Sequence, residues 1–522
     1  MEGVRAAKGE DNVILVDAGD NFSGGGAPFY YNFVDTTSAH LYPRLAAYMG
    51  YDAVVAGHSD FEAGHRVYDR VAREMRKAGV PFLAGNAVSE RTGKGYLPAY
   101  SIIKKGGVKV AVLGYTNAAN ASLMDASCVS DLRFDSLLPL VQEDVDKVRS
   151  KEKPQVVIVV AHTSMGKGDG LNLEKQGLDL FNSLKGVDVL VTGHDHSTKV
   201  LKTDSTVLLD CGRAGQYACL ADIKLVVRGG KVISRSLSGE VESFGSENYD
   251  TAMEEAFKSD YEKVRDFNAS HVGEVKKDLV SREFYYRQCD YMNFLHALAF
   301  SAWPVDISLS ATLLIDGMVP AGEVRYQDIR KIYPYDNKLI VLRLTGAEIL
   351  RYLEASYDAW ISTVPGPAEG THVLRIIQTK DYATGGLKWK LAKSPANFDS
   401  AAGIRYTVDV TKPYGSRVTV SGMADGSPFE MDKDYSVAIT SYRSTGSGGL
   451  MKAAGLMDAR SVEDRIIYRG PEFRTILYRY LKKHGSIDPA VVGDPNVVGS
   501  WRFVPDFAPE AIKADVELIY GK

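Results

Sequence analysis

Between residues 12 and 245, short runs of β-branched residues alternate with stretches of helical periodicity, a pattern that leaves few folds open. The apolar runs are residues 13–16, 53–55, 108–112, 156–160 and 187–191. Helical patterns lie between them, for example around residues 66–77 and 136–151. Strands that are apolar throughout are typically buried on both faces of a sheet, so the alternation predicts a layered α/β domain.

The length and composition favour a globular protein of more than one domain. A chain of 522 residues exceeds the size at which single hydrophobic cores stop growing. Hydrophobic residues make up 45% and charged residues 25%, which excludes disorder of the whole chain. The net charge of -4 gives no general attraction to a nucleic acid polymer or an anionic membrane, so we expect any phosphate recognition to be local.

The sequence shows neither a membrane or export signal nor a cysteine motif. No apolar run reaches the roughly eighteen residues that predict a transmembrane helix. Residues 1–5 lack the apolar stretch of a signal peptide, which taken literally indicates a cytoplasmic protein. Because the four cysteines form no C-x-x-C pair, we expect neither a zinc knuckle nor a thioredoxin motif and interpret them as core residues. They are Cys128, Cys211, Cys219 and Cys289.

The sequence pattern changes after residue 245 and suggests the domain boundaries. We expect the first domain over residues 1–245 and a connecting helix over residues 246–270, where charged residues and a helical period coincide. A mixture of helical and strand-like segments over residues 271–487 predicts a second domain of the α+β or α/β class. Residues 488–522 begin with a Pro- and Gly-containing stretch and are expected to form a tail.

Four of the predicted strands in the first domain run into a potential metal ligand. Asp20 follows the first strand, His58 the second, His162 the fourth, and His194 and His196 the fifth. In α/β sheets ligands bind beyond the carboxyl ends of the strands, so we expect these side chains to converge. One carboxylate with several imidazoles suits a divalent transition metal, which such donors bind at about 2 Å.

Each of these residues taken alone has an ordinary structural explanation. An Asp after a strand usually caps a helix or a turn, and a lone His beside the core is usually hydrogen-bonded. The segment Gly193-His194-Asp195-His196 is more specific, because glycine allows a sharp turn from which two imidazoles project, although an exposed turn explains it about equally well. The metal prediction therefore depends on the order of the residues and their strand context together.

These segments, with Asp60-Phe61-Glu62-Ala63-Gly64 after His58, resemble the calcineurin-like metallophosphoesterase domain of the 5′-nucleotidase and 2′,3′-cyclic-nucleotide phosphodiesterase family. The second half resembles that family's C-terminal domain through Tyr333-Pro334-Tyr335-Asp336-Asn337, Leu344-Thr345-Gly346-Ala347-Glu348-Ile349 and Ser441-Tyr442-Arg443-Ser444-Thr445-Gly446. The resemblance covers nearly the whole chain. It implies an α/β protein with a layered metallophosphoesterase sandwich plus a second, α+β nucleotide-specificity domain.

The resemblance also implies a two-metal site that is only partly present. Asp20 matches the carboxylate that bridges both metals, and His58 stands where the family places an asparagine ligand. His162 and His194 match ligands of the same second metal, and His196 matches a ligand of the first. The other first-metal ligands lie on an earlier Asp-x-His motif, and this chain begins too late to contain it. We expect one largely complete site and one incomplete site, for Zn, Mn, Fe or Co alike.

A second departure from the family concerns the catalytic histidine. Where the family reads Gly-Asn-His-Asp/Glu, this chain reads Gly57-His58-Ser59-Asp60. A gap-free alignment puts Ser59 in the catalytic position and Glu62 in that of its carboxylate partner, whereas a one-residue slip would make His58 the catalytic group. Losing a charged donor to the transition state costs about 3 kcal/mol, or a hundredfold or more in rate, so we expect impaired hydrolysis.

Two explanations account for these departures. The chain is either a shortened form of an exported protein whose true beginning carries a signal peptide and the missing strand, or a catalytically inactive relative that binds nucleotides. We favour the first, because residue 1 lies only a short helix before a central strand, whose sheet would otherwise lack a neighbour. The family resemblance implies a periplasmic or extracellular location, and Ser59 keeps the second explanation open.

In the family, the C-terminal domain holds the nucleobase between two aromatic rings. Tyr335 and Tyr442 match those positions and Asn337 matches a polar contact to the base, with ordinary partial burial as the alternative for each tyrosine. Arg443 offers a fork of donors to a phosphate or a base edge, and a surface salt bridge is equally compatible with the sequence. The expected substrate is a 5′-mononucleotide or a 2′,3′-cyclic nucleotide, with a sugar or other small phosphate ester as a third possibility.

Overall fold

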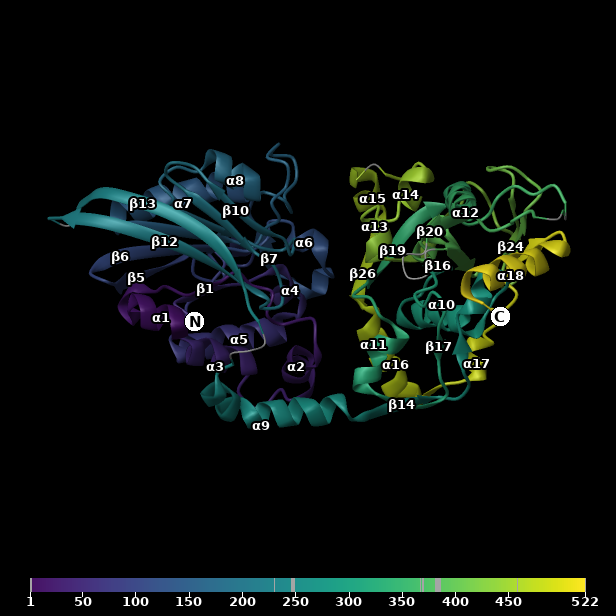
Figure 1. The fold of residues 1–522 in the computed structure, drawn as a ribbon, viewed down its shortest axis with the longest axis horizontal. Coiled ribbons are helices and arrows are strands. Elements are labelled where there is room, and N and C mark those ends of the chain that lie inside the picture. The colour runs from purple at the N-terminus through teal and green to yellow at the C-terminus, as the bar shows by residue number, and fades with distance from the viewer. Residues whose placement is uncertain are drawn as a thin grey trace. The chain divides into compact units, whose positions relative to one another are not determined.

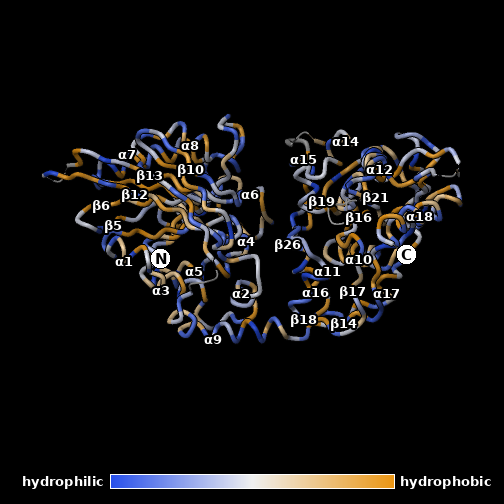
Figure 2. The backbone as a smooth tube through the Cα atoms, viewed as in Figure 1, coloured by the Kyte–Doolittle hydropathy of each residue, from blue (hydrophilic) through white to orange (hydrophobic). Residues whose placement is uncertain are grey.

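The computed structural model describes residues 2–229, 231–245, 249–366, 368, 370–380, 386–457 and 459–521. The chain divides into two compact units, Met1–Arg265 and Asp266–Lys522, each with its own secondary structure (Figure 1). Hydrophobic residues run along the interior strands of each unit (Figure 2). Among the described residues, no helix combines the length and the apolar character needed to cross a membrane.

The first unit is built on a six-stranded sheet with the strand order β10-β11-β9-β8-β6-β5. The four central strands run parallel, and each edge strand is antiparallel to its neighbour. The strands are β5 (Tyr100–Lys105), β6 (Val108–Tyr115), β8 (Val156–Ala161), β9 (Val189–Thr192), β10 (Thr198–Lys202) and β11 (Val207–Cys211). The expected runs at residues 108–112, 156–160 and 187–191 therefore lie in three adjacent parallel strands.

Three smaller sheets complete the strands of the first unit. A parallel sheet contains β1 (Val16–Asp17), β2 (Ala53–Val55) and β3 (Phe82–Leu83). The antiparallel pairs are β4 (Ala87–Ser89) with β7 (Leu132–Phe134), and the long hairpin of β12 (Tyr217–Arg228) with β13 (Lys231–Ser243). The strand expected at residues 13–16 is much shorter, because only its last residue enters the ladder with β2.

The first unit also contains helices, the last of which continues into the second unit. They are α1 (Glu2–Lys8), α2 (Gly26–Phe29), α3 (Leu41–Met49), α4 (His58–Glu62), α5 (His65–Ala78), α6 (Asn120–Leu123), α7 (Leu137–Lys151), α8 (Gly177–Ser183) and α9 (Thr251–Asn268). Short turns of other helix types are η1 (Glu10–Asn12), η2 (Tyr30–Val34) and η3 (Ala126–Cys128). The helical patterns around residues 66–77 and 136–151 thus correspond to α5 and α7.

Strand β8 shows how the valine-rich runs build layered cores. Ile158 and Val160 belong to a core that also contains residues of β2, β11 and β13. Val157 and Val159 belong to a different core, which they share with α7 and α8. Because successive side chains of a strand point to opposite faces, an apolar run without alternation is what a sheet covered on both faces requires.

The second unit is organised around a five-stranded sheet with the order β22-β16-β25-β19-β26. Its strands are β16 (Ile307–Ala311), β19 (Lys338–Thr345), β22 (Asp399–Ala402), β25 (Asp434–Thr440) and β26 (Ile466–Glu472). Three-stranded sheets are β18-β14-β27 and β24-β23-β28, and two-stranded sheets are β15-β17 and β20-β21. Their strands are β14 (His271–Val275), β15 (Leu279–Val280), β17 (Met318–Val319), β18 (Gly322–Arg325), β20 (Ile376–Lys380), β21 (Leu387–Leu391), β23 (Ile404–Asp409), β24 (Val418–Met423), β27 (Ser486–Ile487) and β28 (Trp501–Val504).

The longest helix of the second unit begins at a sequence signal. Thr345 and Glu348 form a capping box, in which the Thr345 hydroxyl accepts from the Glu348 N–H and the Glu348 carboxylate accepts from the Thr345 N–H. This fixes the start of α12 (Gly346–Trp360). The other helices and turns are η4 (Arg282–Tyr285), α10 (Asp290–Ala302), η5 (Tyr326–Asp328), α11 (Ile329–Ile332), η6 (Pro395–Asn397), α13 (Ser441–Ser444), α14 (Leu450–Ala453), α15 (Ala459–Arg465), α16 (Phe473–His484), α17 (Pro489–Val492) and α18 (Phe507–Tyr520).

Two of the expected domain features take a specific form. The helix expected over residues 246–270 corresponds to α9, while residues 246–248 lie outside the described residues. Residues 488–522 were expected to be a tail, but in the structure β28 pairs in parallel with β23 and α18 packs into the core of the second unit. The apolar side chains of this segment account for the difference, because most of them, including Trp501, Phe503 and Ile512, are buried.

Candidate functional site

The parallel strands of the first unit bring the expected metal ligands to common sheet edges. In the small sheet Val16 pairs with Ala53, so the turns after β1 and β2 leave the same edge. In the large sheet Ala161 pairs with Thr192, which places His162 and the Gly193–His194 turn next to each other. This is the convergence at the carboxyl ends of strands that the sequence predicts.

The two turns after β1 and β2 touch each other at glycines. Gly19 has φ +96°, and a Cβ at this position would lie 2.4 Å from the Gly57 nitrogen. A Cβ at Gly57 would lie 2.2 Å from Oδ1 of Asp20. Only glycine allows this approach, and it brings the Asp20 side chain beside the start of α4.

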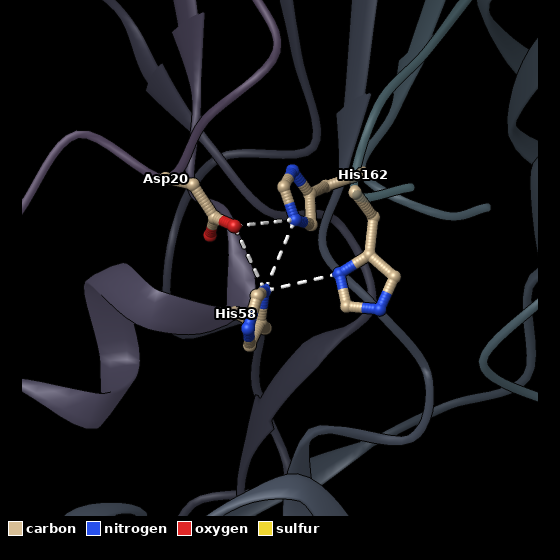
Figure 3. A group of neighbouring side chains, drawn as sticks. Asp20, His58 and His162 are labelled. Atoms are coloured by element: carbon tan, nitrogen blue, oxygen red, sulfur yellow. Dashed lines mark hydrogen bonds and ion pairs between the residues drawn. The ribbon is translucent and has the colours of Figure 1, made fainter. Parts of the chain in front are cut away.

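Four side chains from four separate segments form one donor group. Asp20, His58, His162 and His194 each offer one ligand atom, and these atoms lie within 4.8 Å of one another. Oδ2 of Asp20 is 2.9 Å from Nδ1 of His58 and 3.1 Å from Nε2 of His162. Nδ1 of His58 is 3.2 Å from Nε2 of His162 and 3.1 Å from Nδ1 of His194. Figure 3 shows the labelled side chains pointing toward a common centre.

Two of the histidines have the outer contacts that metal-binding histidines usually have. Nδ1 of His162 lies 2.7 Å from the Ala18 carbonyl oxygen, and Nε2 of His194 lies 3.0 Å from Oε1 of Glu174. Such contacts leave the opposite ring nitrogen free of its proton and directed at a metal. The donor chemistry and these contacts therefore fit a divalent cation. Glu174 was not among the predicted site residues, because nothing in the loop around it signals a partner in a distant strand turn.

Replacing Glu174 by glutamine is expected to weaken metal binding by about 10–100-fold. Loss of the carboxylate makes the His194 ring less basic and fixes its orientation less firmly. Titration calorimetry with Zn²⁺ or Mn²⁺ measures this directly. Glu143→Gln, on an exposed position of α7, is the matched control and should bind as the native protein does. Equal affinities of the two variants would show that the contact between Glu174 and His194 does not support the site.

Asp20 and His162 form a buried charged pair. Burial alone would raise the pKa of Asp20, but the His162 and His58 rings hold it well below its usual range. Burial likewise disfavours charge on His162, but Asp20 raises the pKa of this imidazole to about 9. Burial lowers the pKa of His58, whose neutral ring offers a lone pair. A cation binding here would replace the His162 proton as the partner of Asp20.

Asp60 holds the turn that carries Asp20. Its carboxylate accepts hydrogen bonds from the backbone N–H groups of Gly57, Asp20, Asn21 and Phe22, at 2.7–3.0 Å. Burial, followed by the charge of Asp20, raises the pKa of Asp60 to about 7. Asp60 was not among the predicted site residues. It stands at the third position of α4, but its N-cap Gly57 has no side chain, so the sequence lacks the Ser/Thr signal of a capping box.

The structure places His58 inside the donor group and Ser59 outside it. The Ser59 N–H donates to Oδ1 of Asp20 at 2.8 Å, while its hydroxyl is buried without a hydrogen-bond partner in the described chain. Glu62 ends α4 and is half-buried. The sequence left open whether His58 is a metal ligand or the catalytic group. Its Nδ1 faces Asp20 and His194, which favours the ligand.

His196 lies outside this donor group, which unites the ligands expected for the second metal, and its role at the first metal stays a prediction. It is exposed, and both His194 and His196 have positive φ angles, +91° and +57°. Between them, Asp195 accepts from the Met165 N–H at 3.2 Å, which anchors the turn against the neighbouring loop. This geometry directs His194 inward and leaves His196 at the surface.

In the second unit, the expected base-binding residues leave one end of a strand pair. Leu339 of β19 pairs with Thr440 of β25, and the Ser441 hydroxyl accepts from the Lys338 N–H at 3.0 Å. Tyr335 therefore precedes β19 and Tyr442 follows β25 at the same sheet end. Both tyrosines are exposed, at 46% and 43%. Two large aromatic rings exposed at one sheet end are available to a ligand.

The loop that carries Tyr335 is held from α16. Nε of Arg474 donates to the Tyr333 carbonyl oxygen at 3.1 Å, and Nη1 pairs with Asp336. The Tyr333 ring stacks on Phe473 with centroids 5.0 Å apart. Asn337 is held to the start of α16 through its backbone, where its carbonyl oxygen accepts from the Phe473 N–H at 2.9 Å. Arg474 was not predicted as part of the site, because an arginine in a helix gives no sequence signal that it holds a distant loop.

Arg443 does not offer donors to a ligand; it forms a salt bridge, as the second sequence interpretation had it, but a buried one and not one at the surface. Its side chain is 3% exposed and forms a bidentate pair with Asp399, with Nε–Oδ2 at 3.0 Å and Nη2–Oδ1 at 2.6 Å. The remaining N–H groups donate to Asn397 and to the carbonyl oxygens of Ala396 and Ser447. All five guanidinium donors are thus used within the unit. The guanidinium instead lies 5.3 Å from the centroid of the Tyr442 ring.

Comparison with known proteins gives the same division of the chain. Residues 2–198 match the family model described as calcineurin-like phosphoesterase, the class that the layered first unit and its donor group define. Residues 271–455 match the model described as 5′-nucleotidase, C-terminal domain. The chain therefore belongs to the 5′-nucleotidase family, as a two-domain α/β protein with a metallophosphoesterase sandwich and a 5′-nucleotidase C-terminal domain. Members of the metallophosphoesterase class bind divalent metals.

Individual relatives are distant in sequence. The chain is 21% identical to the trifunctional nucleotide phosphoesterase protein YfkN of Bacillus subtilis, over 92% of this chain and 35% of that protein, so it spans about a third of that relative's length. It is 21% identical to a 5′-nucleotidase of Vibrio vulnificus, over 84% of this chain and 78% of that one. The structure of the NAD nucleotidase of Haemophilus influenzae superposes with a TM-score of 0.59 at 13% identity, covering 97% of this chain and 92% of that one.

Proposed function

We propose that this chain binds one divalent cation at Asp20, His58, His162 and His194 and hydrolyses phosphoesters of nucleotides. The observation that carries the proposal is the donor group, in which four ligand atoms from four segments lie within 4.8 Å. Both 5′-mononucleotides and 2′,3′-cyclic nucleotides are candidate substrates, and relatives named for nucleotide phosphoester chemistry support this class. Zn, Mn, Fe and Co all suit the ligand set.

The residues of the site have separate roles in this proposal. A bound cation of this kind polarises a phosphoryl oxygen and lowers the pKa of a bound water toward neutrality. Asp20 supplies the negative charge of the ligand set, and Glu174 and the Ala18 carbonyl orient His194 and His162. The position of His58 supports the gap-free alignment, in which it is a ligand.

In that alignment Ser59 takes the place of the catalytic imidazole and supplies no charged donor. The loss of such a donor costs about 3 kcal/mol in the transition state, so we expect slow hydrolysis. The alternative function is nucleotide binding without turnover. It is favoured by the buried Ser59 hydroxyl, which stands where the family has an imidazole.

We extend the proposal to the nucleoside part of the substrate. Tyr335 and Tyr442 are proposed to stack on the base, with Asn337 as a polar neighbour, because every nucleobase presents a π-face to an aromatic ring. In this proposal Arg443 packs against the Tyr442 ring and does not touch the ligand. We also propose a periplasmic or extracellular location, on the basis of the family resemblance alone.

The test is hydrolysis by protein loaded with Zn²⁺ or Mn²⁺, followed as phosphate release from AMP and as ring opening of 2′,3′-cyclic AMP to an adenosine monophosphate, with binding of adenosine measured in parallel. We expect slow hydrolysis that depends on the cation, together with adenosine binding. Adenosine binding without hydrolysis of either nucleotide would establish the inactive alternative. Release from a sugar phosphate with no adenosine binding would replace the nucleotide by a different phosphate ester.

Tyr335→Ala and Tyr442→Ala are each expected to weaken adenosine binding by about 1–3 kcal/mol, the range for a base stacked on an aromatic residue. Titration calorimetry gives the change. Tyr335→Phe and Tyr442→Phe keep the ring and should retain most of the affinity. Tyr414→Ala removes a tyrosine of similar exposure elsewhere in the second unit and is the matched control. If the Tyr335 and Tyr442 variants bind as the Tyr414 variant does, the tyrosines do not hold the base.

A further inference from the structure

The loop between α11 and β19 is anchored on both sides of Tyr335, although the side chain of this residue is exposed. Two positions before it, Tyr333 is 2% exposed and stacks on Phe473 with the ring planes 7° apart. Two positions after it, the Asn337 carbonyl oxygen accepts from the Phe473 N–H at 2.9 Å. The Tyr335 side chain, 46% exposed, therefore projects from a backbone that is fixed before any ligand binds.

Arg474, in the first turn of α16, contacts the residues that flank Tyr335. Its Nε donates to the Tyr333 carbonyl oxygen at 3.1 Å, its Nη2 donates to the Pro334 carbonyl oxygen, and its Nη1 pairs with Asp336. The arginine side chain is 12% exposed, whereas that of Asp336 is 64% exposed. An ion pair with an exposed partner contributes little, so the two carbonyl contacts of the buried guanidinium hold the loop.

We propose that Arg474 is a positioning residue, which holds Tyr335 ready for the nucleoside and thereby sets the affinity for it. The inference rests on the proposed function, in which Tyr335 stacks on the base. A ring on a free loop would lose conformational freedom when a ligand binds, and that loss weakens binding. A planar guanidinium fixes several acceptors in one geometry, which the ammonium group of a lysine cannot do. Arg474 thus acts on the ligand only through Tyr335.

The loop of Tyr335 is also joined to the segment that carries Tyr442. The Lys338 N–H, at the start of β19, donates to the hydroxyl of Ser441, the residue before Tyr442, at 3.0 Å. A Tyr335 loop fixed by Arg474 therefore keeps a fixed position relative to the Tyr442 segment. Two rings that hold one base between them require such a fixed relation, because a ligand site depends on preorganised geometry.

The first test is adenosine binding, measured by titration calorimetry on the full chain and on Arg474→Lys, which keeps the charge but not the fork. We expect the affinity to fall by about two- to twelvefold, which corresponds to the ordering of one side chain on binding. Arg479→Lys, at an exposed position of the same helix, is the matched control and should bind as the native chain does. Native affinity in Arg474→Lys would overturn the proposal.

A double variant separates positioning from a general loss of stability. If Arg474 acts only through Tyr335, then Arg474→Lys should not weaken adenosine binding further once Tyr335 is replaced by alanine. A lysine that merely destabilised the second unit would lower the affinity equally in both backgrounds, and that result would refute the positioning role. Native affinity in Tyr335→Ala would remove base stacking from the proposed function and this inference with it. A weakened Tyr335→Ala beside an unchanged Arg474→Lys would remove this inference alone.

Amide exchange followed by mass spectrometry gives a second readout, which requires neither nucleotide nor metal. The Phe473 N–H is protected by the Asn337 carbonyl oxygen, so its exchange reports whether the loop stays attached to α16. In Arg474→Lys we expect faster exchange at Phe473, while the amides of β25 keep their native protection. Unchanged protection at Phe473 would show that the arginine does not hold the loop and would also overturn the proposal.

Discussion

Replacing Asp20 by asparagine is expected to lower the affinity for a divalent cation by at least about a hundredfold, ~2.7 kcal/mol. Asp20 is the only negative charge among the four ligands, and its Oδ2 faces both His58 and His162. An amide has nearly the same shape and still accepts the Ser59 N–H through its oxygen. The loss therefore reports on charge and ligand basicity more than on folding.

Metal analysis after dialysis, followed by titration calorimetry, measures this effect. The native chain should retain about one ion, because one complete donor group exists among the described residues. Asp125→Asn is the control, since the Asp125 carboxylate accepts from the Ser127 N–H in an exposed turn. Two ions held by the native chain, or unchanged affinity in the Asp20 variant, would contradict the assignment of the site.

Regular segments with strong local signals were predictable from the sequence. The valine-rich run of β8 and the helices α5 and α7 lie within a few residues of their predicted bounds, because a buried strand and an amphipathic helix each impose their own period. Residues 501–504 form a short strand in which buried Trp501 and Phe503 alternate with exposed Arg502. Their pairing with β23 was not predictable, because that partner lies far away in the sequence.

The candidate site was also predictable only in part, namely where a local sequence signal exists. The ligands Asp20, His162 and His194 directly follow strands, so the topology of a parallel sheet is enough to bring them together. Their supporting partners are set by loops, and no local pattern connects Glu174 with His194. Arg443 shows the same limit, since its position beside Tyr442 suggested a ligand contact, whereas its buried partner Asp399 lies 44 residues away.

Asp60→Ala is expected to have the largest effect on the local stability of the first unit. Its carboxylate accepts four backbone N–H groups, from Gly57 and from residues 20–22, and its side chain is fully buried. Each buried N–H left without a partner costs about 1–3 kcal/mol, so the loss should exceed about 4 kcal/mol even if water reaches some of the donors. The turn that carries Asp20 would then open.

Amide exchange followed by mass spectrometry is the appropriate measurement, because unfolding of a chain with two units is not a single two-state transition. A loss of about 4 kcal/mol predicts exchange of the residue 20–22 amides roughly a thousandfold faster, with protection of β8 much less affected. Asp60→Asn keeps the shape but turns an amide N–H₂ toward backbone donors, so it should lie between the alanine variant and the native chain. Asp125→Ala, which removes the acceptor of an exposed turn, should leave these amides unchanged.

Because Asp60 reaches the metal only through the turn that it holds, metal affinity should fall with the loss of amide protection. A variant that keeps full protection while losing metal would place Asp60 among the ligands instead.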